Sequence, residues 1–357
     1  MIKTKCKLCR ENDLDNTGAH IFSDALIRSG LYIDGKFKRG DYEAIAVVSR
    51  KKVGFTYFGA SVLAEKRAEL LGKPQTEKEI AETSEHSFIN RELVCRPCER
   101  KFNPVETYFV TQVYQKILDS DKCEGGKFEF NEHINRVTFL MMLINIWRAS
   151  ASKFNDWHIK DEDEEFIRVY LNKVLISDDI DKIKDEARKF HEKVSKFKFQ
   201  LLVSEQTDGK LSENLIFADH PDKPFTIYLN RLIILFSENG FSDFEIPALL
   251  QPYITKRSIE QTQNDETKLT IYQLKNDQRK ELIISYFDRE WKQWVKEAAE
   301  KLKALVKSKF WREITSAELE CFHNVWKSKL GNKEPPTSEL LEESIKITLQ
   351  ILQTDNK

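Results

Sequence analysis

Apolar residues recur at helical spacing through most of the chain beyond residue 130. The segment 131–152 is apolar on nearly every side, which is typical of a central buried helix, whereas 161–175 and 178–196 each have one apolar face. The expected helices of this part are 131–152, 161–175, 178–196, 278–310, 315–330 and 337–353. The pattern therefore predicts a second half that is mainly helical.

Shorter segments alternate between apolar and polar residues, which is the period of a half-buried strand. In the second half these segments are 197–204, 225–236 and 269–274. In the first half, residues 31–60 have the same character and are broken by turn dipeptides such as Asp34-Gly35. Helical patterns occur at 23–29 and, interrupted by Gly72-Lys73-Pro74, at 61–85. The predicted fold class is α+β, mainly α, with a few strands in the second half.

One further helix has strong start signals. Asn103 can cap it, Pro104 suits its first position, and Glu106 stands where it can complete a capping box. The helix is expected to run to Leu118. Its buried face is expected to carry residues at four-residue spacing: Phe109, Val113 and Ile117.

The length and a glycine pair suggest where the chain divides. A chain of 357 residues is long for a single core and short for three, so two domains are expected. Residues 122–127, which contain Gly125-Gly126, form the natural boundary. We therefore predict an N-terminal domain over 1–122 with an insertion at 31–85, and a mainly helical domain over 123–357.

Composition excludes some classes of protein. With 23 Phe, 10 Tyr and 6 Trp the chain has ample apolar surface for a core, so it is not disordered as a whole. The longest apolar run, 139–144, is far short of the roughly 20 residues that a membrane helix needs. No apolar stretch follows the first charged residues, as it would in a signal peptide. We expect a soluble cytoplasmic protein.

Four of the six cysteines form two Cys-x-x-Cys pairs, Cys6 with Cys9 and Cys95 with Cys98. A two-residue spacing lets both thiolates of a pair point at one ion, and two pairs complete a tetrahedral zinc site. Disulfides and a thioredoxin-like redox site are the alternatives, and the expected reducing compartment argues against the first. The sequence predicts structural Zn²⁺ held by these four residues.

The order of these pairs around other polar residues resembles a known family. Ala19-His20-Ile21-Phe22 follows the first pair, and Asn90 lies five residues ahead of Cys95 in a Leu-x-Cys-x-x-Cys-Glu segment. This pattern is similar to the zinc-containing branch of the HNH, or ββα-metal, endonucleases. The resemblance covers about residues 1–110 and implies a treble-clef zinc domain.

The resemblance implies catalytic roles for three residues: His20, Asn90 and Glu99. His20 stands at the position of the general base, and an imidazole with a pKa of about 6.5 can accept a proton at neutral pH. Asn90 matches the residue that orients that base or helps to hold a divalent metal, and Glu99 occupies the polar position on the helix. Mg²⁺ or Mn²⁺ would be the catalytic ion of such a phosphodiester hydrolase.

The resemblance also suggests substrate and partners. It implies DNA rather than RNA as the substrate, a role in bacterial antiviral defence, and a separate ATPase or sensor protein as partner. Residues 1–116 carry 20 Lys and Arg against 16 Asp and Glu, a surplus that permits contact with nucleic acid without requiring it. Association with further copies of the chain is allowed by the pattern, and no membrane is expected.

The sequence departs from the family at two positions. Ala19 stands where an Asp commonly supplies a metal ligand, and Ser23 replaces the usual Pro. A second hypothesis is therefore a catalytically inactive, zinc-stabilised module that binds nucleic acid or protein. In structural interpretations, Asn90 ends a helix or caps a turn, and Glu99 is a first-turn carboxylate favoured by the helix dipole. The acidic run 161–165 likewise fits a solvated first helical turn.

Overall fold

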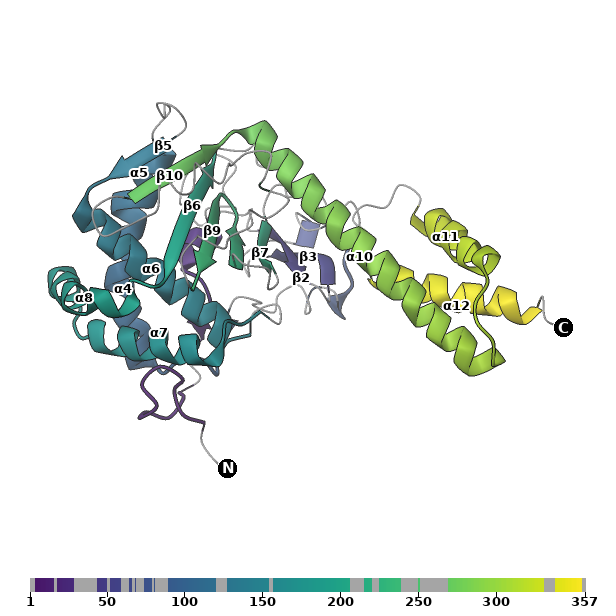
Figure 1. The fold of residues 1–357 in the computed structure, drawn as a ribbon, viewed down its shortest axis with the longest axis horizontal. Coiled ribbons are helices and arrows are strands. Elements are labelled where there is room, and N and C mark those ends of the chain that lie inside the picture. Colours follow the sequence, from purple (N-terminus) through teal and green to yellow (C-terminus); the bar gives the residue numbers. More distant parts are fainter. Residues whose placement is uncertain are drawn as a thin grey trace. The chain divides into compact units, whose positions relative to one another are not determined.

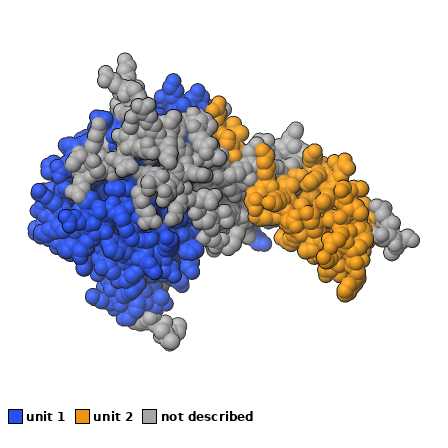
Figure 2. Space-filling model, viewed as in Figure 1, with its two compact units in different colours: residues 1–46, 56–280 blue, residues 47–55, 281–357 orange. Residues whose placement is uncertain are grey.

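The computed structural model divides the chain into two compact units (Figure 2). Unit 1 is residues 1–46 and 56–280, and unit 2 is residues 47–55 and 281–357. The residues described below are 4–15, 18–28, 44–49, 52–58, 64–65, 68, 74–78, 80, 89–119, 127–153, 157–205, 215–219, 225–238, 250, 269–330 and 338–354. The boundary expected at residue 122 falls within unit 1.

The fold is α+β and mainly helical, as the sequence predicts. The helices are α1 (Asp24–Arg28), α4 (Arg96–Phe109), the π-helical turn η1 (Val110–Tyr114), α5 (Gln115–Asp119), α6 (Glu132–Ala151), α7 (Asp161–Val174), α8 (Ile180–Val194), α10 (Asn276–Phe310), α11 (Ser316–Leu330) and α12 (Ser338–Thr354). The helices expected from residue 131 onward all form within a few residues of their predicted bounds. Most of the expected helix over 61–85, and of the insertion 31–85, lies outside the described residues.

Strands form one two-stranded ribbon and one eight-stranded sheet (Figure 1). The ribbon pairs β1 (Ala19–His20) with β4 (Ile89–Asn90). The sheet has the order β3-β2-β7-β8-β9-β6-β10-β5. Its strands are β2 (Ala44–Ser49), β3 (Lys52–Phe58), β5 (Lys127–Phe130), β6 (Lys198–Ser204), β7 (Leu215–Asp219), β8 (Phe225–Leu229), β9 (Leu232–Ser237) and β10 (Leu269–Leu274).

In this sheet β5 and β10, β6 and β9, β7 and β8, and β8 and β9 pair antiparallel, whereas β10 runs parallel to β6. The apolar pattern predicts one strand over 225–236, but the structure has a hairpin there, β8 and β9. The prediction was wrong because two fully buried strands joined by a two-residue turn give one continuous apolar run. The sequence analysis missed β5 and β7 altogether.

Helix α6 is the centre of the core of unit 1. All of its residues from Asn135 to Ala151 are buried, as the all-round apolar pattern predicts. It packs against α4, α7 and α8, which Figure 1 shows together with it. Its Phe139 ring lies 5.3 Å from that of Phe199 on β6, so the same helix also contacts the sheet.

The helix expected from Asn103 begins earlier. Cys95 occupies the N-cap position of α4, Pro97 lies in its first turn, and Pro104 is inside the helix. The local signals at residue 103 misled the prediction because Pro97 provides an equally good helix start seven residues upstream. The predicted buried face is confirmed: Phe109, Val113 and Ile117 are at most 3% exposed.

The turn between β8 and β9 connects the sheet to the N-terminal segment. Asn230 has a φ of 56°, which suits a tight hairpin turn and which Asn tolerates better than most residues. Its side-chain amide donates to the carbonyl oxygens of Leu26 (3.1 Å) and Ile27 (2.7 Å). These carbonyls belong to the last turn of α1, so Asn230 caps that helix from the sheet.

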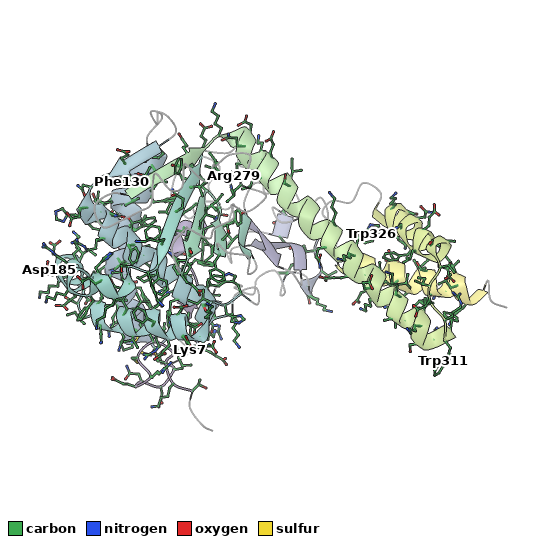
Figure 3. The ribbon with its side chains drawn as sticks, viewed as in Figure 1. Lys7, Phe130, Asp185, Arg279, Trp311 and Trp326 are labelled. Carbon is green, nitrogen blue, oxygen red and sulfur yellow. The ribbon has the colours of Figure 1, made fainter. Side chains whose placement is uncertain are left out.

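Unit 2 contains most of α10 together with α11 and α12, and the last two pack against each other. Phe322 and Trp326 of α11 are buried, with at most 3% exposure. Trp311, which follows α10, is 92% exposed and is labelled in Figure 3. Within the described part of the chain, no helix combines the length and the apolar character that crossing a membrane requires.

We predict that replacing Asn230 weakens unit 1. Asn230→Gly keeps the backbone conformation but removes both hydrogen bonds to α1, so a loss of about 1–3 kcal/mol is expected. Asn230→Ala should lose about 1 kcal/mol more, because alanine is strained at positive φ. Urea unfolding of the full chain measures both values, and two variants as stable as the wild type would contradict the assigned cap.

Candidate metal centre and its surroundings

The structure brings the four cysteines of the two Cys-x-x-Cys pairs together. The Sγ atoms of Cys6, Cys9, Cys95 and Cys98 all lie within 4.8 Å of one another. Three of these residues are buried, and Cys9 is half-buried. Among the described residues this is the one group of three or more Cys, His, Asp or Glu side chains close enough to share an ion.

The first pair lies on a tight knuckle over residues 6–9, which backbone hydrogen bonds fix. The Arg10 amide donates to the Cys6 carbonyl oxygen at 2.9 Å, and the Lys7 amide donates to the carbonyl oxygen of Leu93, just ahead of the second pair, at 2.9 Å. Arg10 ends the knuckle with a φ of 61°, a left-handed conformation that non-glycine residues rarely adopt. The knuckle is therefore held both by its own turn and by the segment that carries the other two cysteines.

The second pair opens α4. Cys95 is its N-cap and Cys98 lies in its first turn, so the helix start fixes the spacing of both thiols. The Asn12 side-chain amide lies 3.5 Å from the Cys95 sulfur and donates to it. The Arg96 amide donates to the Asp15 carboxylate at 3.1 Å. Residues 12 and 15 thus join the N-terminal loop to the start of α4, a link that the sequence analysis did not anticipate.

The four sulfurs perturb one another's protonation. A hydrogen bond from Cys98 lowers the pKa of Cys6 to about 4. The pKa of Cys98 is raised, first because its thiol donates that hydrogen bond, and burial raises the pKa of Cys95. Thiols gathered in this way hold protons that a bound dication would displace.

The donor set fits zinc. Four thiolates suit Zn²⁺, and structural zinc sites are closed tetrahedra of this kind. A disulfide within either pair is absent from the structure, where all four cysteines are free. The cluster is compatible with a zinc site in which these four side chains supply every ligand, so that no coordination position is open to a substrate.

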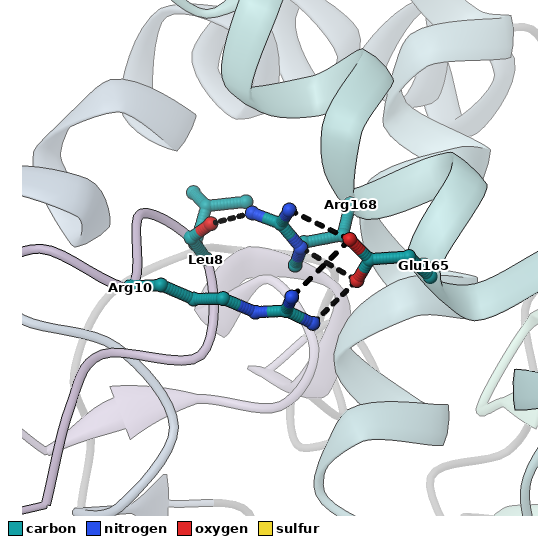
Figure 4. Close-up of polar contacts among 4 residues, drawn as sticks. All are labelled: Leu8, Arg10, Glu165 and Arg168. Carbon is teal, nitrogen blue, oxygen red and sulfur yellow. Dashed lines mark hydrogen bonds and ion pairs between the residues drawn. The ribbon is translucent and has the colours of Figure 1, made fainter.

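Side chains of helix α7 also bind the knuckle (Figure 4). The Arg168 guanidinium donates to the Leu8 carbonyl oxygen at 2.6 Å. Glu165 accepts from Arg168 at 2.8 Å and also binds the Arg10 guanidinium. Both arginines lower the pKa of the Glu165 carboxyl, with the Arg168 hydrogen bond as the largest cause. This clamp, defined as Arg10, Glu165 and Arg168, ties the knuckle to α7.

The acidic run at the start of α7 makes specific contacts rather than only facing solvent. Asp163 is buried and pairs with Lys196, and Glu164 accepts from the Ser150 hydroxyl. Together with Glu165, three of the five acids bind defined partners. The interpretation of a solvated first turn was wrong for these three, because each has a partner outside α7: Lys196, Ser150 or Arg10.

His20 and Asn90 both belong to the β1–β4 ribbon, but their side chains lie on its opposite faces. The register pairs Ala19 with Asn90 and His20 with Ile89. Since paired residues share a face and neighbours alternate, the His20 and Asn90 side chains point away from each other. The Asn90 side-chain oxygen accepts from the Glu92 amide at 2.8 Å, as in a turn. The His20 Nε2 atom lies 3.7 Å from the Asp24 carboxylate, and its side chain is 36% exposed.

Glu99 belongs to a buried ion-pair cluster. Arg148 of α6, 1% exposed, pairs with Glu99 at 3.1 Å and with Glu106 at 2.5 Å. Its guanidinium carbon lies 4.0 Å from the centre of the Phe102 ring, which is on the same face of α4. The expected capping box is thus wrong for Glu106, whose carboxylate binds α6. The signal for this cluster was Arg148 itself, the one charged residue between Val137 and Ala151, since a buried charge must be paired.

The Glu99 carboxyl is hard to ionise. Burial raises its pKa above the ordinary 4.5, and repulsion by Glu106 acts in the same direction. Arg148 opposes this shift most strongly, followed by His20, whose backbone also makes a hydrogen bond to Glu99. The structure therefore places Glu99 beside His20 but commits its carboxylate to Arg148.

Comparisons with family models, curated proteins and solved structures found no match to this chain.

We predict that the purified protein contains one zinc ion per chain, and that Cys98→Ser lowers this content. Structural zinc contributes about 10 kcal/mol or more to folding, comparable to the stability of a whole domain. The variant, or the wild type treated with a chelator, should lose its thermal unfolding transition. Cys321→Ser is the matched control because Cys321 lies outside the cluster. Unchanged zinc content in Cys98→Ser would contradict the site.

We also predict that Glu99 makes stability depend on pH. Because its pKa is raised in the folded state, its stabilising contribution is complete below the ordinary 4.5 and is lost as the pH rises through the raised value. Glu99→Gln should therefore lose less unfolding free energy than the wild type between pH 4.5 and neutrality. Glu162→Gln, an exposed carboxylate on α7, is the control. Parallel profiles of wild type and Glu99→Gln would count against the shift.

Proposed function

We propose that the chain is a zinc-stabilised nucleic-acid-binding protein whose first 110 residues have a treble-clef, HNH-like arrangement without hydrolytic activity. Three features support the treble clef, in chain order: the knuckle at Cys6–Cys9, the β1–β4 ribbon, and α4 with Cys95 and Cys98 at its start. This is the order that the resemblance to the ββα-metal nucleases implies.

The Arg148 cluster is the observation that favours binding over hydrolysis. In an active endonuclease of this kind, Glu99 would have to supply an oxygen to a divalent ion, but its carboxylate is paired with a buried guanidinium. Ala19 is fully buried and has no side-chain oxygen to offer. Asn90 lies on the face opposite His20 and uses its oxygen in a turn. A catalytic Mg²⁺ or Mn²⁺ would therefore lack its expected ligands.

The choice of nucleic acid as partner rests on the resemblance and on the charge beside the knuckle. Lys7 and Arg10 belong to the knuckle or adjoin it, and together with Lys153 and Arg168 they line a cavity beside it. Clustered cations of this kind bind phosphates, and their affinity falls steeply with salt. DNA remains the expected ligand. A role in defence, and a separate ATPase or sensor as partner, stay predictions from the resemblance.

A second candidate is the metal-dependent endonuclease itself, with His20 as general base. The contact between His20 and Asp24 favours it, because a carboxylate beside an imidazole can orient the ring. The half-exposed imidazole could reach a substrate. This candidate needs a divalent ion that other oxygens hold.

One experiment separates the two. The zinc-loaded full chain is titrated with double-stranded DNA and RNA oligonucleotides at several salt concentrations, then incubated with each in the presence of Mg²⁺ or Mn²⁺, beside His20→Ala. We expect binding that weakens steeply with salt, no cleavage, and equal affinity of wild type and His20→Ala. Metal-dependent cleavage that His20→Ala abolishes would establish the second candidate. Failure to bind either nucleic acid at low salt would overturn the proposed function.

A further inference from the structure

A cavity of about 410 Å³ lies beside the zinc knuckle within unit 1. The knuckle, the end of α6, the turn after it and the start of α7 surround it, and Lys7, on the knuckle side, is labelled in Figure 3. Most of its charged lining comes from Lys7, Arg10, Lys153, His158, Asp161 and Arg168. Trp147 and Ala151 add an apolar wall. Its volume is in the range of sites that hold small molecules or parts of larger ones.

Most of the charges in this wall already have structural partners. Lys7 donates to the Ala151 carbonyl oxygen at 2.6 Å. Arg10 and Arg168 share Glu165, and Glu164 accepts from Ser150. These contacts hold the knuckle, α6 and α7 around the cavity. They also cancel part of the charge, since the carboxylates are engaged as well.

Two cationic or titratable side chains are left over. Lys153 and His158 are exposed at the cavity, and neither side chain has a hydrogen bond or ion pair within the part of the chain that the structure describes. Asp161 is the remaining carboxylate of the wall, at the first position of α7, where the helix dipole favours it. The lining has four Lys and Arg against two carboxylates, and Glu165, which pairs with Arg10 and Arg168, neutralises part of this surplus.

The backbone adds an independent observation. Arg10 and Lys153 have φ values of 61° and 53°, and both belong to the lining. Non-glycine residues in this region cost about 1 kcal/mol or more each, and such residues cluster at binding sites. Here the strained conformation is found at two basic residues that face one cavity from different segments.

We infer that this cavity binds a phosphate group of the nucleic-acid strand. A phosphodiester is the anion that matches a cationic cavity of this size on a protein proposed to bind nucleic acid, so the inference rests on the proposed function. Lys153 and His158 supply the direct contacts, because the other cations are committed to holding the walls. Contacts to phosphate position a strand without reading its sequence.

The test compares Lys153→Ala with Lys182→Ala in the full zinc-loaded chain. Lys182 is an exposed lysine of α8 whose side chain has no hydrogen bond or ion pair within the described residues, so both variants remove one positive charge from unit 1. Alanine and lysine have similar strain at positive φ, so Lys153→Ala leaves the backbone unchanged. Lys153→Ala should weaken oligonucleotide binding about 3- to 10-fold and reduce the salt slope by about 1, with little change in Lys182→Ala.

Inorganic pyrophosphate serves as a second probe that is independent of nucleic acid. It should raise the melting temperature of the wild type and of Lys182→Ala, but not of the double variant Lys153→Ala/His158→Ala. Equal zinc content in all variants verifies that the knuckle is intact.

The outcomes distinguish the two proposals. If Lys153→Ala and Lys182→Ala change oligonucleotide binding equally, the phosphate-binding role of the cavity is wrong and the proposed function stands. A pyrophosphate shift that depends on Lys153 and His158, without any oligonucleotide binding, would support the cavity and overturn the proposed function. If neither probe binds, both are wrong.

Discussion

The fold of unit 1 depends on bringing four thiols together from the two ends of a long segment. The residues between Cys9 and Cys95 include α1, the β1–β4 ribbon, β2 and β3, so closing this loop fixes where the N-terminal segment lies. The entropy of closing a long loop grows only slowly with its length, so one ion can compensate for it. The clamp also fixes the knuckle relative to α7, because the Arg168 side chain donates a hydrogen bond to the Leu8 carbonyl oxygen of the knuckle.

Arg148 links the same centre to the central helix. Burying a guanidinium is costly unless carboxylates and hydrogen bonds surround it. Helix α4 supplies two carboxylates, Glu99 and Glu106, to the same guanidinium. The same pairing decides the chemistry of Glu99, which has a nearby cation in the form of a side chain rather than a metal. The position that the resemblance assigns to a catalytic residue is thus paired with a buried guanidinium.

The proposals of binding and of a phosphate cavity follow from one arrangement. Side chains that hold the knuckle against α6 and α7 also line the cavity, so the cysteine cluster and the proposed phosphate site are neighbours. The His20–Asp24 contact lies on the β1–α1 segment, and it is the feature that keeps the endonuclease as a candidate.

The sequence by itself determined the elements whose signals are local. These include the central apolar helix α6, the amphipathic helices, and the cysteine pairs, whose two-residue spacing is a property of adjacent residues. It did not determine which of two proline starts begins α4, nor that 225–236 is a hairpin, because both alternatives satisfy the same local pattern. Only the tertiary structure decided the faces of His20 and Asn90 and the partners of Glu99, Glu106 and the acids of α7. Strand register and buried ion pairs join residues far apart in the chain, and their energies depend on burial that no short segment encodes.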